Sequence, residues 1–189
     1  IYKALNLLYS LRCKKHYMKA RHLLLFLVCC QTFFLQSQNK EIAETATGYY
    51  FIRHAEKNKS NPKDSNPELT TEGKLRALNW AYFFREIPLK AIYSTNYKRT
   101  LSTAQPIADE KNLPIIIYDP NRLNINKFMK ENQGKQVLIV GHSNTTPQLV
   151  NAILGYDRFE QMQDSDNSSL FIIRESKGEI VAEHISVAY

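Results

Sequence analysis

The stretch that decides the fold is YFIRHAEKN, residues 50–58. The apolar residues from Tyr49 to Ile52 are followed directly by Arg53 and His54. A short apolar run of this kind is typical of a buried strand. Either the chain simply reaches the surface where the run ends, or the strand delivers a guanidinium group and an imidazole to a site. The rest of the sequence has to decide between these two interpretations.

Strands and helices alternate along the chain from residue 48 onward. We expect strands at 48–52, 90–94, 115–119, 137–140, 169–175 and 179–187, and helices at 70–86, 97–112, 126–132 and 145–154. This alternation predicts a three-layer α/β/α fold, in which helices cover both faces of a mostly parallel sheet. Thr70 is a suitable N-cap for the first helix. The apolar side chains near helical spacing in that helix are Leu75, Leu78, Trp80, Tyr82 and Phe83. The last two strands are expected to form a hairpin through Lys177 and Gly178.

Three of the expected strands end in residues that can carry chemistry. The first ends at Arg53 and His54, the second is followed shortly by Arg99, and the strand at 137–140 is followed by His142. In a parallel sheet, ligands bind at the carboxyl ends of the strands. We therefore expect these two arginines and two histidines to meet in one crevice.

Such a set of side chains suits the transfer of a phosphoryl group. The planar fork of an arginine matches two phosphate oxygens at once. A neutral imidazole can attack phosphorus and form a transient phosphohistidine. Phosphoryl transfer depends mainly on positioning and charge stabilisation, which the arginines supply, so neither a metal nor a cofactor is required. A zinc site is the rival use of two histidines, but the cysteines all precede residue 38 and no tight ligand spacing is present.

Four motifs resemble those of the histidine phosphatase superfamily, whose fold is that of phosphoglycerate mutase. They are RHAEK at Arg53–Lys57, LTTEGKLRA at Leu69–Ala77, YSTNYKRTLSTA at Tyr93–Ala104, and VLIVGHSNTTP at Val137–Pro147. The motifs occur in the family's order and cover most of residues 48–155. One departure is Ala55, which stands where many members of the family have glycine.

The resemblance implies a role for each matching residue. His54 is similar to the nucleophile that becomes phosphorylated, and Arg53 and Arg99 are similar to the phosphate clamp. His142 resembles the second histidine of the pocket, which contacts the phosphoryl oxygens. The expected activity is metal-independent hydrolysis of a phosphate ester or related phosphoryl compound, in a small molecule or a phosphoprotein. A non-catalytic binder of phosphorylated ligands and a phosphomutase are the alternatives.

The general acid is less obvious than the nucleophile. Many relatives carry a glutamate after the third strand, whereas this segment has Asp119 and no glutamate before Glu131. Glu56 and Asp119 are both candidates to protonate a leaving oxygen. We favour Glu56 because it lies beside the nucleophile in the sequence.

The basic character of the chain is concentrated in its first 37 residues. The 189-residue chain has a net charge of +7, and residues 1–37 contribute six lysines and arginines and no acidic residue, which leaves +1 for residues 38–189. The charge is therefore no argument for a nucleic-acid partner. From Met18 onward, a basic start and a short apolar stretch resemble a secretory signal peptide over residues 18–37.

This segment sets the expected domain boundaries and location. We expect residues 1–17 to lie upstream of the natural start, residues 38–47 to form a linker, and residues 48–189 to form the domain. The protein is then secreted or periplasmic. A membrane anchor is the alternative, although the apolar stretch is shorter than the roughly 20 residues of a spanning helix.

Overall fold

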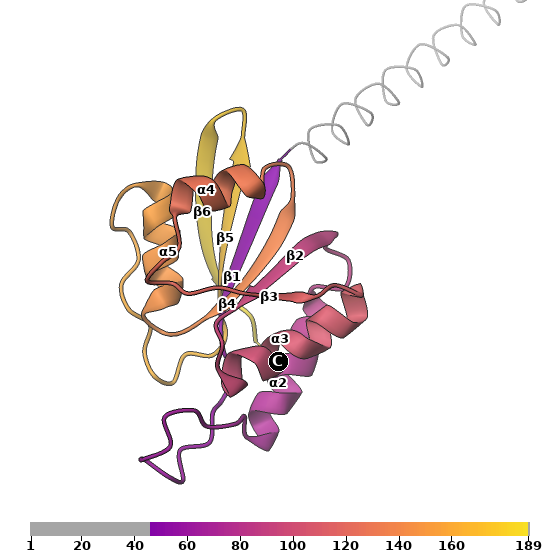
Figure 1. Ribbon diagram of the computed structural model, residues 1–189, viewed down its shortest axis with the longest axis vertical. Coiled ribbons are helices and arrows are strands. Elements are labelled where there is room, and N and C mark those ends of the chain that lie inside the picture. Colours follow the sequence, from indigo (N-terminus) through magenta and orange to yellow (C-terminus); the bar gives the residue numbers. More distant parts are fainter. Residues whose placement is uncertain (1–45, 189) are drawn as a thin grey trace, which may run out of the picture. The chain divides into compact units, whose positions relative to one another are not determined.

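The computed structural model describes residues 46–188 and contains a mixed six-stranded sheet (Figure 1). The strands are β1 (Thr47–Arg53), β2 (Leu89–Ser94), β3 (Ile115–Ile117), β4 (Gln136–Gly141), β5 (Ser169–Ser176) and β6 (Glu179–Ser186). The helices are α2 (Thr71–Phe83), α3 (Lys98–Lys111), α4 (Ile125–Glu131) and α5 (Thr145–Leu154). The strand order is β3-β2-β4-β1-β5-β6. The first four strands of this order are parallel, and β5 and β6 are antiparallel to their neighbours.

Helices cover both faces of the sheet, as the alternation of strands and helices predicts. Alternate residues of β1 point to opposite faces because side chains in a strand repeat every two residues. Tyr50 and Ile52 pack with Trp80 of α2 and residues of α3, whereas Tyr49 and Phe51 pack against α4 and α5. Figure 1 shows the two helix pairs on opposite sides of the strands. The predicted three-layer α/β/α fold is confirmed.

The buried face of α2 differs from the prediction. Leu75, Leu78 and Tyr82 are 58%, 56% and 71% exposed, whereas Gly73, Ala77 and Trp80 are buried. The reason is a close approach of the helix to the end of β1: a Cβ atom on Gly73 would lie 2.3 Å from the carbonyl oxygen of Glu56. Only a face that begins with glycine fits there. The helix also ends earlier than predicted.

Most other elements match the prediction to within a few residues. Helix α5 has the predicted bounds, β1 begins one residue earlier than predicted, and β3 ends at Ile117 rather than at residue 119. The β5–β6 hairpin turns at Lys177 and Gly178, whose φ values are 54° and 82°. Two consecutive positive φ values are those of a type I′ turn, which matches the twist of the paired strands.

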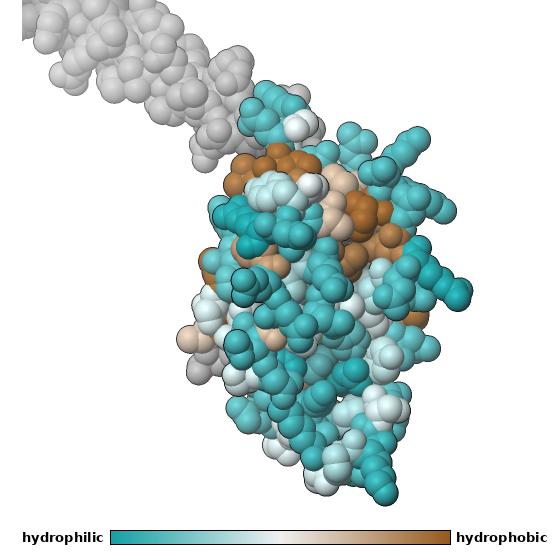
Figure 2. All heavy atoms as spheres, turned by 90° about the vertical axis from the view of Figure 1, so that its left-hand side faces the viewer, coloured by the Kyte–Doolittle hydropathy of each residue, from teal (hydrophilic) through white to brown (hydrophobic). Residues whose placement is uncertain are grey.

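Strand β6 forms one edge of the sheet. Its exposed apolar side chains, Ile180, Val181 and Ile185, are interspersed with the exposed charges of Glu179 and Glu183. Charged side chains on an edge strand oppose pairing with further chains. The face of the molecule in Figure 2 is largely hydrophilic, with hydrophobic residues gathered in its upper part.

The predicted signal peptide, residues 18–37, lies outside the described residues, as does most of the predicted linker. Secretion therefore stays a prediction. Within residues 46–188, no helix has the length and apolar character needed to cross a membrane.

Candidate active site

The carboxyl ends of β1, β2 and β4 meet around one pocket. In the register of the sheet, Arg53 of β1 lies beside Gly141 of β4. The backbone N–H of His54 donates to the carbonyl of Gly141 at 3.0 Å, which places His54 next to His142. The pocket has a volume of about 400 Å³, and Arg53, His54, Arg99 and His142 all line it. The structure thus brings together the four side chains that the sequence placed at strand ends.

The imidazole of His54 is held in one orientation. The side chain is buried, and its Nδ1 lies 2.7 Å from the carbonyl oxygen of Ala55. A carbonyl oxygen only accepts hydrogen bonds, so Nδ1 must carry the proton. The other ring nitrogen, Nε2, then has a free lone pair in the neutral imidazole. This is the tautomer that a nucleophilic histidine needs.

Both histidines are neutral at neutral pH. Burial, opposed by the hydrogen bond to Ala55 and reinforced by the charges of Arg53 and Arg99, lowers the pKa of His54 to about 3. Burial and the positive charge of Arg99 lower the pKa of His142 to about 4. Positive neighbours and the loss of water both disfavour a charged imidazole. The lone pair of His54 is therefore available without a base to deprotonate it.

His142 takes part in a chain of hydrogen bonds at the end of β2. Its Nε2 lies 2.9 Å from Oγ1 of Thr95, and its Nδ1 lies 3.5 Å from Nη2 of Arg99. The Thr95 hydroxyl donates to Thr100, at 3.0 Å, so it accepts from His142. This fixes the proton of neutral His142 on Nε2. The two imidazole rings lie 5.5 Å apart, centre to centre.

Arg53 is anchored by segment 163–166, which carries no recognisable sequence motif. Its Nη1 donates to the carbonyls of Gln163 and Asp166, at 2.9 and 3.0 Å, and its Nη2 donates to Oδ1 of Asp164 at 2.9 Å. Its buried Nε has no hydrogen-bond partner among the described residues. An unpaired, buried N–H on a cation that lines a pocket is suited to bind an anion.

Asp164 lines the pocket and was not predicted as a site residue. Hydrogen bonds from Lys59 and Arg53 lower the pKa of its carboxyl to about 2. The carboxylate thus links Lys59, in the loop after β1, to Arg53, the predicted clamp residue. No motif surrounds Asp164 in the sequence, so only the folded structure shows that it lies at the pocket.

Arg99 enters the pocket from the first turn of α3. Its guanidinium lies over the ring of Tyr97, 4.3 Å from the ring centre, and its Nη1 donates to the carbonyl of Ser65 at 3.4 Å. Stacking on an aromatic ring orients a guanidinium group without using its N–H donors. Its buried Nε also has no hydrogen-bond partner among the described residues. Arg53 makes three hydrogen bonds and Arg99 makes two, so each guanidinium, with about five N–H groups, keeps donors beside the pocket that it lines.

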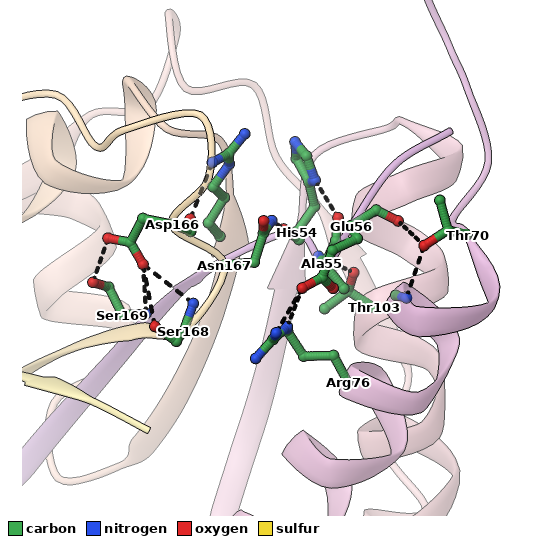
Figure 3. Close-up of polar contacts among 12 residues, drawn as sticks. His54, Ala55, Glu56, Thr70, Arg76, Thr103, Asp166, Asn167, Ser168 and Ser169 are labelled. Atoms are coloured by element: carbon green, nitrogen blue, oxygen red, sulfur yellow. Dashed lines mark hydrogen bonds and ion pairs between the residues drawn. The ribbon is translucent and has the colours of Figure 1, made fainter. Parts of the chain in front are cut away.

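Glu56, the preferred candidate for the general acid, lies outside the pocket. The carboxylate of Glu56 does not line the pocket. It faces α2, where Nε and Nη2 of Arg76 both lie 2.6 Å from its Oε1 (Figure 3). The ion pair with Arg76 therefore holds the carboxylate of Glu56 against α2. Asp119, the other candidate, does line the pocket.

No metal-binding cluster is present in the part of the chain that the structure describes: no group of three or more His, Cys, Asp or Glu side chains is arranged to hold an ion.

Comparison with known families agrees with this geometry. Residues 49–120 match the model of the histidine phosphatase superfamily, branch 1. This match supports the predicted family. The match contains the first three sequence motifs, and His142 lies beyond it, so the sheet register is what connects His142 to the site. No curated protein sequence matches the chain.

Solved structures of this superfamily's fold are similar over most of the described chain. SixA from Agrobacterium tumefaciens is 19% identical, with a TM-score of 0.57, over 75% of this chain and 99% of that one. A phosphoserine phosphatase from Entamoeba histolytica, in complex with 3-phosphoglyceric acid, is 17% identical, with a TM-score of 0.58, over 75% and 98%. A protein histidine phosphatase SixA with bound tungstate is 15% identical, with a TM-score of 0.57, over 74% and 96%. At these identities the likeness establishes the fold, and the family match supports the assignment as a phosphatase.

Proposed function

We propose that the chain is a metal-independent phosphatase that hydrolyses phosphorylated substrates through a phosphohistidine at His54. The observation that carries the proposal is the pocket itself. Its two guanidinium groups each keep a buried donor, and its neutral nucleophile has Nδ1 engaged by a backbone carbonyl. The structurally similar SixA and phosphoserine phosphatase support a phosphorylated substrate, either a small molecule or a protein.

The first half of the reaction transfers the phosphoryl group to the enzyme. The lone pair on Nε2 of His54 attacks phosphorus, and the bond from phosphorus to the leaving oxygen breaks. That oxygen keeps the electron pair. Arg53 and Arg99 stabilise the charge on the transferring oxygens. The proton stays on Nδ1 and is donated in a hydrogen bond to the carbonyl of Ala55, which stabilises the positive charge that the imidazole gains.

The second half returns the enzyme to its starting state. A water molecule attacks the phosphohistidine, the bond between phosphorus and Nε2 breaks, and its electrons return to the imidazole. The proton of the attacking water passes to a carboxylate of the pocket wall, and inorganic phosphate leaves. Phosphorus bonded to an imidazolium nitrogen is readily displaced, so this step needs only a positioned water.

The test of the proposal is turnover without metal. The protein, purified in excess EDTA, should release phosphate from para-nitrophenyl phosphate and acetyl phosphate, and EDTA should not change the rate. Rapid denaturation during turnover should trap an acid-labile, alkali-stable phosphoryl group on the chain. Binding of phosphate esters without turnover would instead identify a non-catalytic binder.

We further propose that Asp119 protonates the leaving oxygen, because it is a candidate acid that lines the pocket. An alkoxide leaves poorly without a proton, whereas nitrophenolate and acetate leave well. The variant Asp119→Asn should therefore lower kcat for an alkyl phosphate such as glycerol phosphate by about 10²-fold, while kcat for para-nitrophenyl phosphate falls by less than about threefold.

Two variants control for other effects of this change. Asp109→Asn removes an exposed carboxylate of α3 that accepts a hydrogen bond from Gln105, and should leave both rates unchanged. Glu56→Gln should affect both substrates alike, because its carboxylate is bonded to Arg76 outside the pocket. If Asp119→Asn slows both substrates equally, Asp119 is not the acid.

A further inference from the structure

The peptide group between His54 and Ala55 is held by one hydrogen bond on each side. Its carbonyl accepts a hydrogen bond of 2.8 Å from Nδ2 of Asn167, and its N–H donates to Oγ1 of Thr103 at 2.9 Å. Both side chains are buried, and neither lines the pocket. Figure 3 shows Asn167 and Thr103 approaching this segment from different elements. The contacts leave both polar groups of this peptide satisfied.

Thr103 also connects the nucleophile to the second arginine. Its hydroxyl donates to the carbonyl of Arg99, one helical turn earlier in α3, at 2.7 Å. A hydroxyl has one proton to donate, so its lone pairs face the N–H of Ala55. One side chain therefore fixes the backbone of His54–Ala55 relative to the turn of α3 that carries Arg99.

The same segment, His54–Ala55, supplies the carbonyl that selects the tautomer of His54. The proton acceptor for Nδ1 is the carbonyl of Ala55. The next residue is fixed as well, because the carbonyl of Glu56 accepts from the N–H of Thr70 at 2.9 Å and α2 packs closely against it at Gly73. With both flanking peptides held, the carbonyl of Ala55 has little freedom to turn away from the imidazole.

We propose that Thr103 and Asn167 are positioning residues for the nucleophile: they hold the His54–Ala55 backbone so that Nδ1 stays protonated and Nε2 faces the phosphorus. The proposal rests on the proposed phosphatase function. Neither residue touches the substrate. If these two hydrogen bonds are lost, the imidazole gains access to the other tautomer, in which Nε2 carries the proton and cannot attack.

The variant Thr103→Val tests this directly, because valine keeps the shape and removes the hydroxyl. We expect kcat for para-nitrophenyl phosphate to fall by about 10²-fold, with KM changed by less than about threefold, since a small misplacement of a reacting group affects the chemical step most. Thr103→Ser restores the hydroxyl and should recover most of the activity.

A matched control exists at the other end of β1. Thr47 is also buried, and its Oγ1 accepts a backbone N–H, that of Gly134, at 2.9 Å. Thr47→Val therefore removes the same kind of hydrogen bond far from the pocket. It should lower the thermal unfolding midpoint by an amount similar to Thr103→Val and leave kcat unchanged. Asn167→Leu provides a second route to the same loss of kcat. The double variant with Thr103→Val should lose less than the product of the two single effects, because both act on one peptide.

A readout other than activity separates this inference from the proposed function. Long-range proton–nitrogen NMR spectra should show His54 protonated at Nδ1 alone in the wild type and in Thr47→Val, and a mixture of tautomers in Thr103→Val. If Thr103→Val keeps a single tautomer, or if Thr47→Val loses as much kcat, the positioning role is overturned. If the wild type shows the single tautomer but no turnover, the proposed function fails and the tautomer assignment stands.

Discussion

Replacing His54 with alanine is expected to lower kcat by at least about 10⁴-fold, because the reaction loses the atom that attacks phosphorus. No other described side chain in the pocket is placed to substitute for it. The imidazole of His142 is turned to Thr95 and Arg99 by its hydrogen bonds. The variant should also fail to trap a phosphoryl group on the chain during turnover.

Binding of phosphate should survive this replacement. Arg53 and Arg99 keep their buried donors, which do not depend on the imidazole. Calorimetric titration with inorganic phosphate should therefore give a dissociation constant within about tenfold of the wild-type value, since a neutral imidazole contributes less to anion binding than two guanidinium groups. His184→Ala is the matched control: it removes an imidazole that bonds to Ser169 and does not line the pocket. Equal turnover in wild type and His54→Ala would exclude the phosphohistidine mechanism.

Replacing Arg53 with lysine is expected to lower kcat/KM by about 10²- to 10³-fold, although the charge is kept. The guanidinium makes three hydrogen bonds to the segment 163–166 and still has N–H groups left beside the pocket that it lines. An ammonium group carries its three N–H donors on one nitrogen, so it cannot reach segment 163–166 and a phosphoryl group at the same time. Either the carbonyls of Gln163 and Asp166 or the phosphoryl oxygens lose their donor.

Two measurements distinguish these losses. The free energy of unfolding reports on the contacts with segment 163–166, and the dissociation constant for phosphate reports on the clamp. Arg85→Lys serves as the control, because Arg85 is an exposed arginine paired with Glu110. That change should leave kcat/KM unaffected, as exposed ion pairs contribute little. If Arg53→Lys retains kcat/KM within about fivefold, the fork of Arg53 is not part of the phosphate clamp, since a lost transition-state donor costs more than that.

Elements that depend on a local pattern were predictable from the amino-acid sequence. The apolar run before Arg53 and the one before His142 identify two strands, and parallel strands place their carboxyl ends at one edge of the sheet. That single topological rule brings together Arg53 and His142, which lie roughly ninety positions apart along the chain. Helix α2 shows where such patterns fail. Its apolar residues lie on two faces of the helix. The close approach of Gly73 to Glu56 buries the face of Gly73, Ala77 and Trp80, although the other face carries more large apolar side chains.

By itself, the sequence determined the order of strands and helices, and it placed Arg53, His54 and His142 at strand ends, because strand periodicity and strand ends are local properties. Only the tertiary structure decided which carboxylates face the pocket. Arg76 of α2 draws Glu56 away, while irregular segments deliver Asp119 and Asp164. The hydrogen bonds that hold the His54–Ala55 peptide are equally non-local, since Thr103 and Asn167 are separated from their partners by 48 and 113 residues. No periodicity encodes contacts of that kind: they form only when the whole chain has packed.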